Sequence, residues 1–115
     1  MILTSILLFL VAALAGLYMA ARIFGGNLPP WIVVILHGLL AASGLLVLIY
    51  GLLVGAQPPA AVIGAVLLVI AAFGGFFMFS YQLRKALPPK AVVVVHAIAA
   101  VLGVLCLIVN AMGMA

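Results

Sequence analysis

Two histidines, His37 and His96, are the residues of this sequence best suited to bind a metal or a cofactor. Each follows a proline pair by seven residues, Pro29-Pro30 in the first case and Pro88-Pro89 in the second. Both stand in long apolar stretches, where an ionisable side chain is costly and usually has a function inside a helical bundle. The sequence contains no Asp or Glu that could pair with either ring. Neutral imidazole is a common ligand of haem iron, zinc and copper, so the two histidines are the primary candidate ligands.

Small residues follow each histidine on one helical face. Four and seven residues after the histidines come Ala41, Gly44, Ala100 and Gly103. Positions at these spacings align with the histidine along an α-helix, and a strip without bulky side chains leaves room for a flat, wide group. Helical bundles hold cofactors with side chains from facing helices. We therefore expect one haem b per chain, with His37 and His96 as its axial ligands.

Two further residue pairs are candidates for contact with that haem. Met19 and Met78 are expected near the depth of the histidines, where they would pack on the porphyrin edge. Arg22 and Arg84, near the ends of the first and third apolar stretches, are expected to meet the haem propionates.

Other interpretations of the same residues stay open. The histidines could form a structural pair that hydrogen-bonds backbone carbonyls, in a cofactor-free accessory subunit of a larger membrane complex. Small residues at spacing four, such as Ala12/Gly16 and Ala71/Gly75, commonly just let transmembrane helices approach closely. Two histidines with two methionines would suit Cu(I), a soft ion, and a transport role is a further alternative. Lipid head groups and topology would explain the arginines without a propionate.

The candidate residues belong to an internal repeat. The shift that superimposes His37 on His96 also superimposes Ala41 on Ala100, Gly44 on Gly103, Gly16 on Gly75, Met19 on Met78, and Leu28-Pro29-Pro30 on Leu87-Pro88-Pro89. We place repeat 1 at about 1–55 and repeat 2 at about 60–115. Each copy predicts a helix hairpin, with prolines in the first turn of its second helix. Two spans per copy give both copies one orientation, so a pseudo-twofold axis along the membrane normal should bring the histidines to equal depth.

The elements that carry these residues are predicted from the composition. Of the 115 residues, 72% are hydrophobic and 3% are charged, which excludes a soluble globular domain. The apolar stretches run roughly over Ile2–Phe24, Trp31–Val54, Ala60–Tyr81 and Ala91–Met112. Each reaches the roughly 20 residues that a helix needs to cross a bilayer, and none shows the alternation of membrane strands. We predict an all-α integral membrane protein: one domain over 1–115, a four-transmembrane-helix bundle made of two tandem helix-hairpin repeats.

The basic residues predict the orientation of the bundle. Arg22, Arg84, Lys85 and Lys90 lie at the first and third connections. The positive-inside rule places these connections in the cytoplasm and both termini outside, in a bacterial-type inner membrane. The net charge of +4 is then a topology signal rather than a nucleic-acid site. No positive residue precedes Arg22, so we expect the first stretch to be a helix and not a signal peptide.

Missing residues exclude several classes of four-helix membrane protein. Without acids, the chain lacks the glutamate of small multidrug transporters and the carboxylate of a proton-driven rotor subunit. With one cysteine, Cys106, it lacks the cysteine pairs of quinone-linked disulfide enzymes.

The architecture, with histidines inside the membrane, resembles the four-helix transmembrane b-type cytochromes of the b561-like type. The resemblance implies axial ligation by His37 and His96. Those cytochromes use four histidines for two haems, whereas two histidines here allow one. Filled axial positions block oxygen binding, so the expected function is electron transfer, to or from quinone or a partner subunit.

Overall fold

The computed structural model describes residues 1–55 and 57–113. Its four helices are α1 (Ile2–Phe24), α2 (Trp31–Val54), α3 (Pro59–Leu83) and α4 (Lys90–Ala111). Each is long and apolar enough to cross a membrane, which confirms the predicted four-span architecture. The helix bounds lie within two residues of the apolar stretches of the sequence.

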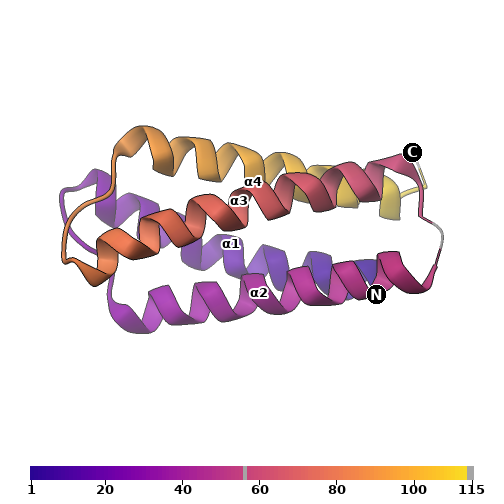
Figure 1. Cartoon of the computed structure of the whole chain (residues 1–115), viewed down its shortest axis with the longest axis horizontal. Helices are drawn as coiled ribbons and strands as arrows, with labels where there is room; N and C mark the ends of the chain where they lie inside the picture. Colours follow the sequence, from indigo (N-terminus) through magenta and orange to yellow (C-terminus); the bar gives the residue numbers. More distant parts are fainter. Residues whose placement is uncertain (56, 114–115) are drawn as a thin grey trace.

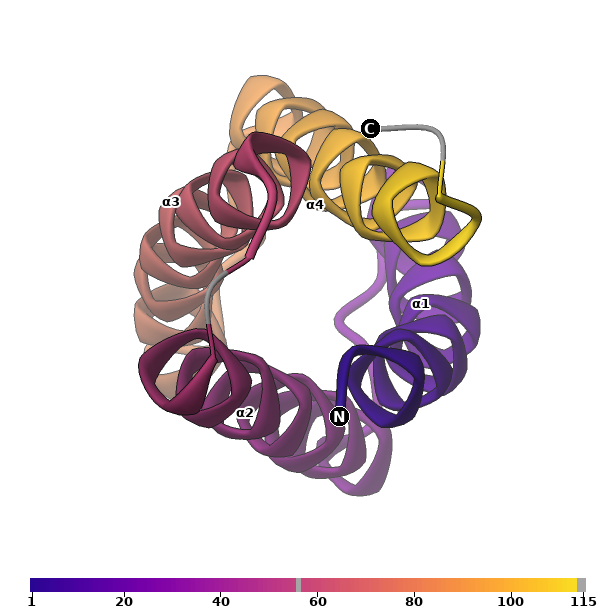
Figure 2. The same ribbon diagram turned by 90° about the vertical axis from the view of Figure 1, so that its right-hand side faces the viewer.

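The helices form an antiparallel bundle (Figure 1). The α1–α2 and α3–α4 connections lie at one end, here called the basic end, and α1 begins and α4 ends at the other, here called the terminal end. Viewed along the bundle, the helices follow one another in chain order, so α2 lies diagonally opposite α4 (Figure 2). The helices of each hairpin pack closely, the two hairpins contact each other more sparsely, and diagonal helices have no Cα atoms within 8 Å of one another.

The helix starts follow from the prolines. Pro30 and Pro89 are the residues that precede α2 and α4, so these prolines lie just before the first turn rather than in it. Their carbonyls accept the first helical hydrogen bonds, from Val34 at 3.1 Å and from Val93 at 3.3 Å. Pro59 opens α3 at the first helical position, where proline costs no intrahelical hydrogen bond.

The two hairpin turns share one backbone geometry. Each helix ends with an amide that donates to the carbonyl five residues earlier, Asn27 to Arg22 and Ala86 to Tyr81, both at 3.0 Å. Gly26 and Lys85, which the internal repeat superimposes, hold the left-handed conformation in these turns, with φ of 85° and 56°. This bond pattern and the left-handed residue are those of a Schellman motif. The local structure of the turns therefore repeats with the sequence.

Different contacts close the two ends of the bundle. At the terminal end, the large buried side chains form one cluster drawn from all four helices: Ile6, Phe9, Leu48, Leu68 and Leu107. At the basic end, three contacts join the hairpins: the Gln82 amide donates to Pro29 O at 3.0 Å, Trp31 meets Phe79 edge-on at 5.8 Å, and the Lys90 ammonium lies 5.7 Å from the centre of the Phe24 ring. The two histidines lie between these ends.

Candidate functional site

His37 on α2 and His96 on α4 meet across the diagonal of the bundle. Their ring centroids are 6.3 Å apart and their planes are inclined by 67°. Because the backbones of α2 and α4 stay more than 8 Å apart at every Cα pair, the two rings bridge a gap that the helices themselves do not close. The structure thus brings together the two ligands expected from the sequence.

Each imidazole also hydrogen-bonds the other helix of its own hairpin. The Nδ1 atom of His37 lies 2.7 Å from Ala12 O on α1, and Nδ1 of His96 lies 2.7 Å from Ala71 O on α3. A carbonyl oxygen can only accept, so Nδ1 is the donor in each ring, and in a neutral ring Nε2 then carries the lone pair. Histidines that bind metals usually make such a second hydrogen bond, which fixes the tautomer and the ring orientation. The hydrogen bonds of both rings therefore favour the tautomer whose Nε2 could bind a metal.

Both histidines are partly exposed. Among the described residues, the fully buried side-chain polar atoms without a partner are Arg22 Nε and Asn110 Oδ1. Neither Nε2 atom is therefore a fully buried group left without a partner.

Along α2 and α4, the histidines stand where partly exposed residues interrupt the buried ones. On α2, His37 and Ala41 are partly exposed, whereas Val34 before them and Gly44 and Leu48 after them are buried. The same order recurs on α4 along Val93, His96, Ala100, Gly103 and Leu107. On α1 and α3, partly exposed residues of the matching level are Gly16, Met19, Gly75 and Met78. The methionines proposed from the sequence are thus partly exposed, three residues beyond the glycines that contact the rings.

Glycines make room for the two rings. A Cβ atom on Gly16 would lie 2.9 Å from Cε1 of His37, and one on Gly75 would lie 3.4 Å from Cε1 of His96. From their spacing alone, Ala12/Gly16 and Ala71/Gly75 were expected only to let helices pack closely, and not to belong to the site. Each Ala/Gly pair stands at the same distance before its histidine, and this repeat was the sequence signal that could have assigned the pairs to the site. Each histidine hydrogen-bonds the carbonyl of the alanine 25 residues before it.

The four small residues expected beside a haem divide into two kinds. Two stay at the level of the rings and are partly exposed: Ala41 and Ala100. The two glycines lie closer to the terminal end and admit side chains of the neighbouring helix. A Cβ on Gly44 would lie 3.1 Å from the Phe9 ring, and a Cβ on Gly103 would lie 2.8 Å from Leu68 Cγ. Packing within each hairpin thus accounts for the small size of Gly44 and Gly103.

The two arginines expected near propionates have different surroundings. Arg22 is partly buried, its Nη2 donates to Leu28 O at 2.9 Å, and its buried Nε has no acceptor among the described residues. Arg84 is exposed, its Nε donates to Ser80 O at 3.2 Å, and its guanidinium lies 4.3 Å from the centre of the Tyr81 ring. Of these two arginines, only Arg22 therefore has a buried N–H group without a hydrogen-bond acceptor among the described residues.

The sequence has no Asp or Glu, so the side chains that most commonly bind metals are here His, Cys and Met. The described residues contain no group of three or more His, Cys, Asp or Glu side chains that could hold an ion.

No protein-family model, no curated protein and no solved structure matches this chain.

Proposed function

We propose that this transmembrane four-helix protein is a b-type cytochrome, which holds one haem between His37 and His96 and transfers electrons. The observation that supports the proposal best is the matched pair of Nδ1–carbonyl hydrogen bonds, because they leave Nε2 of both rings free as ligands. Haem iron with two imidazole ligands has no vacant axial position, which favours electron transfer over oxygen chemistry.

The spacing of the rings fits a metal between them. His37 and His96 are the residues that would hold such a metal, each through one ring nitrogen. The observed separation of the centroids is 6.3 Å. A bound haem would supply a one-electron iron couple, and the protein would supply ligands, apolar walls and a fixed orientation.

The surroundings of the rings suit an apolar macrocycle. Side chains at their level are small or flexible: Ala41, Ala100, Met19 and Met78, all partly exposed. Arg22 has a buried Nε donor without an acceptor among the described residues, and a propionate would satisfy that donor by a charge-assisted hydrogen bond. Because the basic residues favour a cytoplasmic position for their end, we place the haem nearer the cytoplasmic face.

A reduced-minus-oxidised absorption spectrum of the detergent-purified protein, with haem and metal content per chain, tests the proposal. We expect sharp low-spin bands at about one haem per chain. His37→Ala and His96→Ala should each abolish stoichiometric haem. The matched control is Leu36→Ala, at an exposed position beside His37, which should keep it. A double histidine variant that still binds one haem would refute the assignment.

The carbonyl hydrogen bonds also support a second candidate, a cofactor-free accessory subunit, since they give each histidine a partner within the chain. A protein that stays colourless and metal-free after haem supplementation, and that co-purifies with larger membrane partners, would favour it.

Copper found in place of haem would instead favour Cu(I) held by the two histidines with Met19 and Met78.

A further inference from the structure

A buried hydrogen bond ties the two hairpins together at the basic end. The side-chain amide of Gln82, near the end of α3, donates to Pro29 O, just before α2, at 3.0 Å. Gln82 is 7% exposed, and Pro29 is buried as well. Within residues 1–55 and 57–113, this is the side-chain hydrogen bond that runs from one hairpin to the other. It therefore joins the second hairpin to the start of the helix that carries His37.

The internal repeat shows that burial alone does not require an amide at this position. The residue of the first hairpin equivalent to Gln82 is Ile23, which is also 7% exposed. Isoleucine has no side-chain donor, so the junction of α1 with α4 cannot repeat this bond. A buried amide costs free energy unless it finds a partner, whereas Ile23 is buried without that cost. A single buried polar side chain can fix the register of packed helices, and the bond to Pro29 gives Gln82 such a role.

A second hydrogen bond holds the same segment from the other side. Arg22 on α1 donates from Nη2 to Leu28 O at 2.9 Å, next to the carbonyl that Gln82 binds. One carbonyl of this segment is thus bound by its own hairpin and the next by the other hairpin. His37 follows Pro29 by eight residues, which is about 12 Å along a helix. Because α2 is an uninterrupted helix over this stretch, a shift of Pro29 would be carried to His37.

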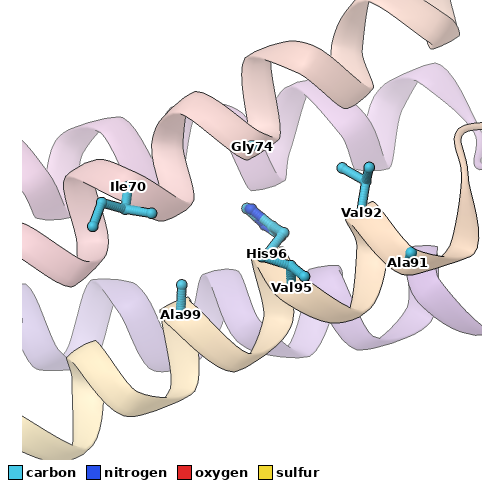
Figure 3. Close-up of a pocket in the computed structure, with 7 residues that line it drawn as sticks. All are labelled: Ile70, Gly74, Ala91, Val92, Val95, His96 and Ala99. Atoms are coloured by element: carbon cyan, nitrogen blue, oxygen red, sulfur yellow. The ribbon is translucent and has the colours of Figure 1, made fainter.

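The ring of His96 has more room within its own hairpin than the ring of His37. A Cβ on Gly16 would lie 2.9 Å from Cε1 of His37, whereas one on Gly75 would lie 3.4 Å from Cε1 of His96. A hollow of about 210 Å³ between α3 and α4 also adjoins His96, beside Gly74 (Figure 3). Packing inside the hairpins therefore does not fix both rings equally, and their separation depends on the contacts between the hairpins.

We infer that Gln82 is a positioning residue, which holds His37 opposite His96 through its bond to Pro29 O. The inference rests on the proposed function, since it concerns the geometry of the two proposed ligands. With the bond in place, the ring centroids stand 6.3 Å apart and the ring planes are inclined by 67°. Without it, the buried carbonyl of Pro29 loses its donor, and the start of α2 is free to shift against α3.

The distance between spin labels beside the two histidines tests the inference without any cofactor. The labels are placed at Leu36→Cys and Val95→Cys, which are exposed and equivalent in the repeat, in a Cys106→Ala background. Double electron–electron resonance in phospholipid nanodiscs should give one narrow distance for the parent. We expect a shifted or broadened distribution for Gln82→Met, which keeps the length of the side chain but has no donor. Gln82→Asn, whose amide is one methylene shorter, is a milder second variant and should change the distribution in the same way.

Ile23→Met is the matched control. It introduces the same side chain at the equivalent buried position of the first hairpin, where no side-chain hydrogen bond is lost. Its label distances should equal those of the parent. Parent-like distances in both Gln82 variants, or an equal disturbance in Ile23→Met, would overturn the inference.

The haem-loaded protein gives a second signature. At saturating haem, Gln82→Met should keep about one haem per chain but show a broadened or second low-spin electron paramagnetic resonance signal, because its ligand planes are no longer fixed. Its haem affinity should fall roughly threefold or more, the effect of losing a hydrogen bond between transmembrane helices. Unaltered label distances would refute the positioning role alone, whereas a parent protein that binds no haem would refute the cytochrome alone.

Discussion

His37 and His96 belong to different copies of the sequence repeat, yet their ring centroids lie 6.3 Å apart. Each ring is held by a carbonyl of its own hairpin, so each hairpin contributes half of the site with a preset orientation. The hairpins contact each other only sparsely. A group bound to both rings would therefore add a link between two units that contact each other more sparsely than the helices within each hairpin do.

Haem binding should consequently stabilise the assembled bundle. A ligand at 100 times its dissociation constant adds about 2.7 kcal/mol to the native state, so we expect a clear rise of the unfolding midpoint when haem is added. Denaturation in mixed detergent micelles, with and without haem, measures this. His96→Ala should show no rise, and an equal rise in that variant would indicate haem binding elsewhere.

Gly16→Ala should disturb the site, whereas Gly75→Ala should not. The new Cβ at Gly16 would lie 2.9 Å from Cε1 of His37, but the one at Gly75 would lie 3.4 Å from Cε1 of His96. The first variant must displace a ring that is fixed by a 2.7 Å hydrogen bond. Loss of such an orienting bond typically weakens metal binding about 10-fold or more. Haem titrations of the two variants provide the comparison, and equal affinities would contradict the proposed role of Gly16.

The sequence predicted the helices and the histidine pairing well, for identifiable reasons. Apolar length determines the spans, and the repeated Pro-Pro spacing places His37 and His96 at one level. The carbonyl partners could not be predicted, because every residue has a carbonyl and only the packing of α1 on α2 selects that of Ala12.

Small residues were ambiguous for a similar reason. Gly44 and Gly103 permit either a cofactor or close packing, and the positions of Phe9 and Leu68 on neighbouring helices decide between the two.

The two arginines provide a test of the propionate contact. Arg22→Gln should weaken haem binding, because a hydrogen bond to a charged group contributes about 1.5–3 kcal/mol, which corresponds to roughly 10-fold or more in affinity. Arg84→Gln should leave the affinity unchanged, because Arg84 is exposed and lies on Tyr81. Both variants remove one positive charge, so they are matched for charge. Equal effects would indicate a general electrostatic influence instead of a contact at Arg22.

Lys85→Gly should stabilise the protein. Lys85 has φ of 56°, in the turn position that Gly26 occupies in the first hairpin. The left-handed conformation costs a non-glycine residue about 1–2 kcal/mol. Replacement by glycine removes this cost, but glycine loses more conformational entropy on folding, which cancels part of the gain. We expect a net gain of about 0.5–1 kcal/mol in the free energy of unfolding. Lys85→Ala, which removes the charge but keeps the strain, should bring no such gain.

Gly103→Ala should destabilise the second hairpin. Its Cβ would lie 2.8 Å from Leu68 Cγ and 3.1 Å from the backbone oxygen of Gly64. Since a backbone atom cannot turn aside like a side chain, α3 and α4 would have to separate, and overpacking of this kind costs about 1–3 kcal/mol. Gly38→Ala is the matched control on α2, where a Cβ would meet nothing within 4 Å, and it should change the stability by less than about 1 kcal/mol. Unfolding curves of both variants in one detergent give the comparison. If Gly103→Ala were as stable as Gly38→Ala, the packing assigned to Gly103 would be wrong, and its place beside a cofactor would again need to be considered.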